Sequence, residues 1–144
     1  SAQPGMPNMG LAAALRMLNL PIDPAWTLQM HATDEIFIEQ VARMLSHPNR
    51  PDALTCFNDT VAASVYEAAR RAGLRVGADL GVSGKDNSAL CGKLSPALSS
   101  VETHCDEIAR LAVQTLLQYT DFEHPPQAPY CLEPDIVARQ STNR

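Results

Sequence analysis

The 144-residue sequence is poor in aromatic residues, in clustered positive charge and in closely spaced metal ligands. Aromatic residues make up 5% of the chain, so a core has to rest on Leu, Val, Ile and Ala. The formal net charge is −5, and basic residues do not cluster beyond Arg70 and Arg71. Affinity for nucleic acid depends largely on such clusters, because they neutralise phosphates. The composition therefore indicates a chain that does not itself hold DNA.

Cysteine and histidine occur four times each, but at scattered positions. No C-x-x-C pair is present, and structural zinc requires paired ligand spacing. We therefore expect no metal site and no cofactor. The cysteines, three of which lie in apolar sequence, are typical of reduced thiols in a cytoplasmic protein.

Long apolar runs and a secretory signal are also missing from the sequence. No apolar stretch reaches the ~18 residues that a membrane-spanning helix needs. Residues 1–7 are expected to be flexible or to form a non-native junction. The length fits one domain or a piece of a larger protein, and we expect it in the cytoplasm.

Apolar periodicity alternates between helical and strand patterns along the chain. Helices are predicted over residues 9–20, 33–45, 59–73 and 104–120. Strands are predicted over residues 26–31, 53–57, 80–84, 97–101 and in the tail 130–142. Thr33 is expected to cap the second helix, and Gly73 to end the third. Such alternation is typical of an α/β fold with a parallel sheet flanked by helices.

Polar residues directly follow two of the predicted buried strands. Asn58 and Asp59 come after strand 53–57, and Lys85, Asp86 and Asn87 come after strand 80–84. In open α/β sheets, ligands bind outside the carboxyl ends of the strands. The pattern therefore predicts a ligand site at this edge of the sheet.

Sequence motifs of the common α/β enzymes are absent. The chain has no G-x-S-x-G elbow, no G-x-G-x-x-G loop, no Walker loop and no paired Cys/His arrangement. The glycines of "GLRVGADLG" have the wrong spacing for dinucleotide binding. We therefore expect a protein that is not an enzyme, and an α/β enzyme is the weaker alternative.

Five sequence patterns between residues 50 and 142 occur together in one known family. They are "RPDALT", "NDTVAA", "GLRVGADLGVSGKD", "LSPALSSV" and "ARQST". In this order and spacing the chain resembles the effector-binding core of lactose-repressor-type (LacI/GalR) transcription regulators; residues 8–49 align more loosely. The resemblance implies a periplasmic-binding-protein-like fold, in which two α/β subdomains close on a small ligand by hinge motion. It also implies a separate N-terminal helix-turn-helix domain that reads operator DNA.

The resemblance also implies a domain organisation. Residues 8–102 correspond to an incomplete C-terminal subdomain, and residues 123–144 to the C-terminal strands and tail. Residues 103–122 correspond to a crossover helix that normally packs on the other subdomain. No DNA reader and little of that other subdomain are visible in the chain, so the crossover helix is expected to find its partner in an oligomer or a swapped contact.

The resemblance places ligand contacts at two of the polar residues after the strands. The Asn58 amide can cap the following helix or can offer a donor and an acceptor to a ligand; the resemblance favours the ligand. Asp59 is expected to serve the first turn of that helix, where a carboxylate suits the dipole. Asp86 can form a turn or can accept from a ligand hydroxyl, and the resemblance again favours the ligand.

Three further residues are weaker candidates for ligand binding. Thr103 corresponds to an effector contact in relatives, but is more readily a helix N-cap with Asp106 three residues on. Lys85 is either a solvated side chain or an anion-binding one. His31 can donate a hydrogen bond to a ligand, although an isolated histidine is more often structural.

Two departures from the family pattern leave the ligand class open. Pro7 stands where relatives carry an arginine that anchors the effector, and Ala32 where relatives often stack an aromatic ring. The interpretation that we favour is the effector-binding part of a bacterial repressor, a homodimer that binds a sugar or similar polar metabolite. The alternative is a solute-binding protein of a transport system with the same fold.

Overall fold

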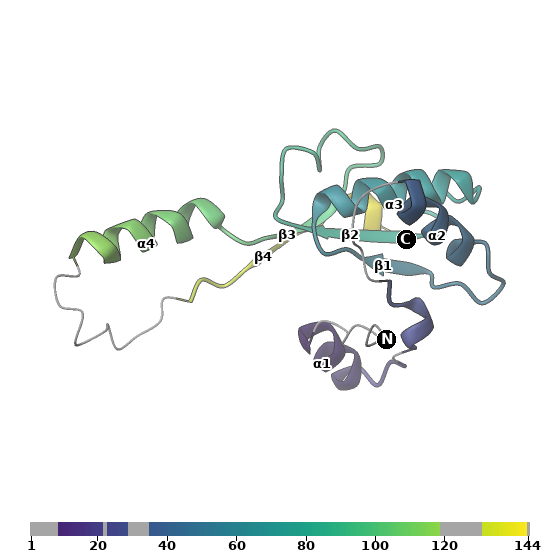
Figure 1. Cartoon of the computed structure of the whole chain (residues 1–144), viewed down its shortest axis with the longest axis horizontal. Coiled ribbons are helices and arrows are strands. Elements are labelled where there is room, and N and C mark those ends of the chain that lie inside the picture. Colours follow the sequence, from purple (N-terminus) through teal and green to yellow (C-terminus); the bar gives the residue numbers. More distant parts are fainter. Residues whose placement is uncertain (1–8, 22, 29–34, 119–130, 144) are drawn as a thin grey trace.

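The computed structural model describes residues 9–21, 23–28, 35–118 and 131–143 (Figure 1). The elements in chain order are α1 (Met9–Met17), η1 (Pro24–Trp26), α2 (Glu35–Leu45), β1 (Ala53–Thr55), α3 (Asp59–Arg71), β2 (Gly81–Lys85), β3 (Ser99–Glu102), α4 (Cys105–Gln118), β4 (Asp135–Val137) and η2 (Gln140–Thr142). The predicted α/β alternation is confirmed from α2 to α4. The described part of the predicted strand 26–31 is no strand, because Trp26 closes the short helix η1 and residues 27–28 lie outside any strand. Thr33, the expected cap of α2, lies outside the described residues.

The sheet has four strands in the order β1-β2-β3-β4. β1 pairs with β2 and β2 with β3 in parallel, with Leu54 opposite Val82. β4 runs antiparallel to β3, with Val101 opposite Ile136. The sheet is therefore mostly parallel, as predicted, with one antiparallel strand at its edge. The chain returns from α4 directly beside β3, and a strand that returns along its neighbour has to run in the opposite direction.

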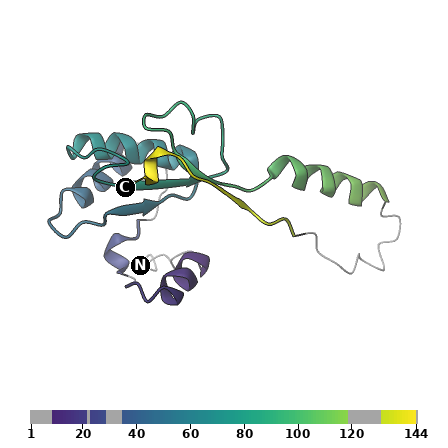
Figure 2. The ribbon, with the colours of Figure 1, turned by 180° about the vertical axis from the view of Figure 1, so that it is seen from behind.

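The hydrophobic core lies between the sheet and the two helices α2 and α3, which share one side of it (Figures 1 and 2). Both helices turn an i, i+4 stripe inward. The buried side chains of the helices are Phe37, Val41, Leu45, Val61, Ala62, Val65, Ala68 and Ala69. From the strands and loops they meet Leu80, Val82, Cys91 and Leu98. Burial of each leucine or valine contributes roughly 1.5–3 kcal/mol.

The C-terminal end of α3 is determined by the residues that directly follow the helix. Gly73 has a φ of 72°, a left-handed conformation that glycine adopts without steric cost. The amide of Leu74 donates to the Ala69 carbonyl at 2.9 Å, which closes the last turn. The expectation that Gly73 ends this helix is confirmed.

The C-terminal tail fastens the two central strands. Ser141 is fully buried, and its hydroxyl donates to the Val82 carbonyl at 2.6 Å and accepts from the Ser99 amide at 2.8 Å. Arg139 donates to the Leu98 carbonyl at 2.7 Å. Two strands that are distant from the tail in the sequence are thus tied to it by hydrogen bonds.

Helix α4 lies away from the sheet, at the far end of β3 and β4 (Figures 1 and 2). Its apolar side chains are largely exposed within this chain, with Leu116 at 72% and Leu117 at 78% of full exposure. The helix begins at Cys105, inside the predicted crossover region 103–122. The boundaries of that region and its packing on another subdomain stay predictions.

The buried position of Ser141 predicts a stability effect. We expect Ser141→Ala to lower the free energy of unfolding by about 1–3 kcal/mol, because it leaves the Val82 carbonyl and the Ser99 amide without a partner. Urea denaturation of the variant and the wild-type protein measures this difference. Ser46→Ala is the matched control, since the exposed Ser46 hydroxyl only contacts the Ala42 carbonyl of its own helix. Equal, small changes in both variants contradict the prediction.

Candidate functional site

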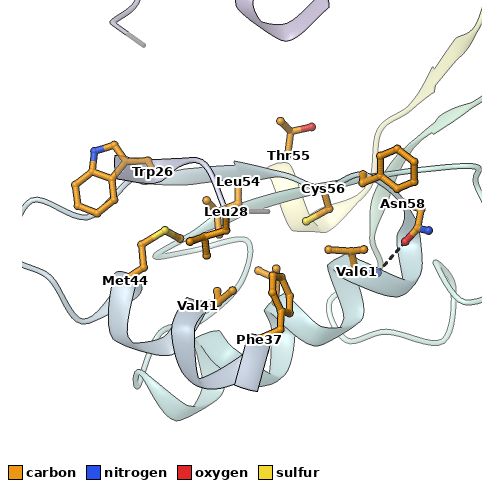
Figure 3. A pocket seen from close by; sticks show the side chains of 12 residues that line it. Trp26, Leu28, Phe37, Val41, Met44, Leu54, Thr55, Cys56, Asn58 and Val61 are labelled. Atoms are coloured by element: carbon orange, nitrogen blue, oxygen red, sulfur yellow. Dashed lines mark hydrogen bonds between the residues drawn. The ribbon is translucent and has the colours of Figure 1, made fainter. Parts of the chain in front are cut away.

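The carboxyl end of β1 passes into α3 through Phe57 and Asn58. Asn58 has an extended backbone, and its Oδ1 accepts from the Val61 amide at 2.9 Å (Figure 3). The side chain therefore caps α3, which is the alternative that the resemblance did not favour. Contact of the remaining amide nitrogen with a ligand stays a prediction.

A pocket of about 480 Å³ opens beside Asn58, between β1, α2, α3 and the segment around Trp26 (Figure 3). Its lining is mostly apolar, with Thr55 and Asn58 at the carboxyl end of β1. The lining residues are Trp26, Leu28, Phe37, Val41, Met44, Leu54, Thr55, Cys56, Phe57, Asn58, Val61 and Val65. This pocket suits an apolar group more than a sugar ring, whose hydroxyls need several polar partners.

Asp59 lies in the first turn of α3, as predicted, and also makes contacts that the sequence did not predict. Its side chain is buried, with 2% of its surface exposed. Oδ1 accepts from the Ser100 hydroxyl at 2.6 Å, and Oδ2 accepts from the Ser88 amide at 2.7 Å. Its carboxylate therefore also joins α3 to β3 and to the segment after β2.

The same contacts determine the ionisation of Asp59. Burial alone raises the pKa of this carboxyl, but hydrogen bonds from Ser100, Ser88 and Cys91 stabilise the charged form and together lower it below the ordinary value. The carboxylate is therefore ionised at neutral pH. An ionised carboxylate only accepts hydrogen bonds, which fixes the direction of each bond that it makes.

Asp86 and Asn87 form a strained turn at the end of β2. Their φ angles are 96° and 45°, both in the left-handed region that non-glycine residues rarely adopt. The Asp86 amide donates to the Val101 carbonyl at 2.8 Å, and the Asn87 amide donates to the Ser100 hydroxyl at 3.0 Å. The Asp86 side chain is partly exposed at the surface of this turn. The prediction that it accepts from a ligand hydroxyl stands untested.

The Asn87 side chain is held on both sides. Its Oδ1 accepts from Arg139 at 2.7 Å, and its Nδ2 donates to Glu102 Oε2 at 3.0 Å. In the sequence Asn87 was noted only as part of the polar run after strand 80–84, and Glu102 was not noted. Adjacency to Asp86 was the one signal available for Asn87, and Glu102 has none, because its contact depends on the pairing of β2 and β3.

Lys85 lies between the two strand ends. Its Nζ is 3.7 Å from Asp86 Oδ1 and 4.8 Å from the centroid of the Phe57 ring. The ammonium group thus contacts an aromatic face from the segment after β1 and the carboxylate that directly follows its own strand. Lys85 connects the neighbourhood of Asn58 with that of Asp86.

Thr103 does not cap α4. The helix begins at Cys105, and the His104 carbonyl accepts the first helical bond, from the Ile108 amide at 3.0 Å. The residue at the N-cap position is therefore His104, and the expectation of a Thr103 cap is wrong. The Thr103 hydroxyl instead lies 3.1 Å from Cys105 Sγ.

A second hollow of about 430 Å³ lies on the other side of the turn at Asp86. Its side chains are mostly acidic. They come from Asp86, Asn87, Glu102, His104, Cys105, Asp106 and Glu107. The predicted site residues are thus divided: Asn58 lines the first hollow, Asp86 lines the second, and Lys85 lies between them. His31, Pro7 and Ala32 lie outside the described residues.

The cysteines differ from the expectation of three apolar environments. Cys91 is buried and Cys56 is partly buried, whereas Cys105 and Cys131 are exposed. Burial, with a smaller contribution from the charge of Asp59, raises the pKa of Cys56 to about 12. Across the described ranges, no group of three or more His, Cys, Asp or Glu side chains could hold a metal ion. In the same part of the chain, no helix is long and apolar enough to cross a bilayer.

A mostly parallel sheet with polar residues at the carboxyl ends of its strands is the arrangement of α/β ligand-binding domains. The chain belongs to the periplasmic binding protein-like domain family, whose model matches residues 8–142. It is 33% identical to the ribose operon repressor of Haemophilus influenzae over 132 residues, which cover 92% of this chain and 40% of the repressor.

Solved structures of similar proteins agree with this relationship. A LacI-family regulatory protein from Chloroflexus aggregans has a TM-score of 0.82 and 30% identity, covering 93% of this chain and 48% of that one. A LacI-family regulator from Arthrobacter sp. FB24, in complex with lactose, has a TM-score of 0.76 and 28% identity, covering 94% of this chain and 50% of that one. The predicted fold class and the resemblance to LacI-type regulators are confirmed. The chain spans about two fifths to one half of these relatives.

The lowered pKa of Asp59 predicts a pH dependence of stability. In the unfolded chain an aspartate titrates at about 3.9, and in the folded protein Asp59 titrates lower. Its stabilising contribution is therefore complete above the unfolded pKa and disappears as the pH falls through the folded pKa. Wild type should be more stable than Asp59→Asn. We expect this difference in unfolding free energy to be constant at neutral pH and to shrink below about pH 4.

Urea denaturation at a series of pH values measures this difference. Asp106→Asn, an exposed carboxylate in the first turn of α4, is the matched control and should change stability little. A wild-type minus Asp59→Asn difference that stays constant down to pH 3 contradicts the prediction.

Proposed function

We propose that this chain is the effector-binding and dimerising part of a bacterial LacI-type transcriptional repressor. The observation that carries the proposal is the placement of Asn58, Lys85 and Asp86 at or just after the carboxyl ends of two adjacent parallel strands. Relatives of this chain are repressors and LacI-family regulators. The protein would act in the cytoplasm, perform no catalysis and contact operator DNA through a separate helix-turn-helix domain.

The effector that fits this edge is a sugar or a similar polar metabolite rather than an anion. Asp86 can accept from a hydroxyl group, and the Asn58 amide nitrogen and the Thr103 hydroxyl can bind hydroxyl oxygens. Lys85 is the single cation among the candidates, and its Nζ already lies 3.7 Å from Asp86. The hollow around Asp86 adds Glu102, Asp106 and Glu107, and this negative field disfavours an anionic ligand. The lactose-bound neighbour and the name of the ribose operon repressor support the same class.

The two separate hollows fit a cleft of which this chain forms one wall. A second α/β subdomain, preceding these residues, would close over Asn58 and Asp86, and His31 would add a hydrogen bond if it faces the same space. A ligand that binds the closed state better than the open one shifts the population between them, and operator affinity follows that shift.

A solute-binding protein of a transport system is the second candidate, because it shares the fold. The full-length gene distinguishes the two proteins. A helix-turn-helix before these residues supports the repressor, and a secretory signal supports the transport protein.

Ligand-induced stabilisation tests the proposed site. We expect D-ribose, lactose or another member of a panel of sugars, nucleobases and phosphorylated metabolites to stabilise the full-length protein. At 100 times its Kd the ligand adds about 2.7 kcal/mol. Asp86→Ala should abolish the thermal shift without unfolding the protein, because the Asp86 side chain is partly exposed.

A charge-matched pair of variants separates the two roles of Asn58. Asn58→Asp keeps the oxygen that accepts from the Val61 amide but removes the amide donor, so it should fold and lose the thermal shift. Asn49→Asp makes the same change on an exposed loop and should respond like wild type. If Asp86→Ala and Asn58→Asp both respond normally to the ligand that stabilises wild type, the site assignment is wrong.

The exposed apolar side chains of α4 predict association of the isolated chain. We expect residues 1–144 alone to sediment as a dimer or a larger species, because Leu116 and Leu117 have no cover within the described chain. Leu116→Glu should shift the distribution toward monomer, and Gln114→Glu, on the same exposed helix, is the control. Analytical ultracentrifugation measures both. A monodisperse wild-type monomer contradicts the prediction.

A further inference from the structure

The turn that carries Asp86 needs support from outside itself. Asp86 and Asn87 are consecutive non-glycine residues with φ angles of 96° and 45°. Such backbone conformations cost free energy and persist only where the surrounding structure holds them. Whatever holds this turn therefore also determines where the Asp86 carboxylate lies.

Two hydrogen-bonded routes run from this turn to Asp59. The Ser88 amide donates directly to Asp59 Oδ2 at 2.7 Å. The Asn87 amide donates to the Ser100 hydroxyl at 3.0 Å, and that hydroxyl donates in turn to Asp59 Oδ1 at 2.6 Å. Both carboxylate oxygens are thus engaged, and the Ser100 hydroxyl has one consistent orientation, since it donates to the carboxylate and accepts from the amide.

The Asp59 carboxylate lies directly against the backbone of β2. A Cβ atom at Gly84 would overlap Asp59 Oδ1, and would come within 3.2 Å of Asp59 Cα and 3.1 Å of a Leu98 methyl carbon. Gly84 is two residues before Asp86, so the buried carboxylate lies against the strand that leads into the turn with Asp86. Asp59 also directly follows Asn58, the candidate at the end of β1.

We propose that Asp59 is a positioning residue of the ligand site. Its buried carboxylate holds residues 86–88 in the conformation that presents Asp86, through Ser88 and Ser100, and it does not itself touch the ligand. This inference rests on the proposed function, because it assigns to Asp86 the ligand contact described there. It gives Asp59 a role beyond that of stabilising the fold.

Two variants break the two routes at different points. Asp59→Asn replaces one of the two acceptor oxygens by an NH2 group, so the side chain can accept from the Ser88 amide or from the Ser100 hydroxyl but no longer from both. Ser100→Ala removes the link to Asn87 and leaves the Ser88 contact in place. We expect faster hydrogen–deuterium exchange of the amides of residues 87 and 88 in Asp59→Asn, and of residue 87 in Ser100→Ala, both in the full-length protein.

Ligand affinity is the second measurement. We expect Asp59→Asn to weaken binding of D-ribose or lactose, whichever stabilises wild type, by about tenfold or more in isothermal titration. Ser100→Ala should weaken it in the same direction. The double variant should lose less than the product of the two single losses, because both variants act through one network.

Leu45→Ala is the control for a general loss of stability. Leu45 is buried in the core and lines neither hollow, so this variant should lower the melting temperature and leave the exchange of residues 87–88 and the affinity unchanged. Weakening of binding by Leu45→Ala as large as that by Asp59→Asn overturns the inference. Unchanged exchange and affinity in Asp59→Asn and Ser100→Ala overturn it as well.

Failure of the proposed function gives a different result. If no sugar of the panel binds wild type, the sugar assignment of the effector fails, while the exchange rates of residues 87 and 88 still decide whether Asp59 orders the turn. If Asp59→Asn does not fold, Ser100→Ala carries both measurements, and unchanged values in that variant overturn the inference.

Discussion

The close approach of α3 to β2 is the contact on which the rest of the structure depends. Ala62, Ala68 and Ala69 are completely buried, and these small side chains allow the helix to lie close to the sheet. Gly84 contributes none from the strand, and the space so created is filled by the Asp59 carboxylate. A larger side chain at either surface would separate the helix from the sheet, and the hydrogen bonds from Ser88 and Ser100 to Asp59 would be lost. Packing and polar geometry are thus set by the same small residues.

The sequence predicted the elements better than the contacts between them. Helical and strand periodicity is a local signal, and it located α2, β1, α3, β2 and β3. The strand expected over residues 26–31 failed in its described part, because three apolar or aromatic residues in a short run do not distinguish a strand from a turn of 3-10 helix. Thr103 satisfied the sequence rule for an N-cap, yet α4 begins two residues later, since helix starts depend on backbone geometry as well as residue type.

The candidate site shows the same division between local and distant information. Asn58 and its capped helix could be located from adjacent residues. The role of Asp59 could not, because its partners Ser88 and Ser100 are 29 and 41 positions away in the sequence. Asn87 and Glu102 came together only through the parallel pairing of β2 with β3. A carboxylate in the first turn of a helix is explained by the helix dipole alone. The contacts of Asp59 with Ser88 and Ser100 therefore could not be anticipated from the local sequence.

The position of α4 at the end of two paired strands has a mechanical consequence. The helix has 14 residues and is therefore about 21 Å long. His104 and Asp135 form a contact of 3.0 Å between the two strands at its base. A rotation of the strand pair by about 10° at this base would carry the far end of the helix through about 4 Å, a simple product of angle and length. A small twist of β3 and β4 near the acidic hollow would therefore displace the far end of α4 by several ångströms. A displacement of that size is enough to change the contacts of a packed surface.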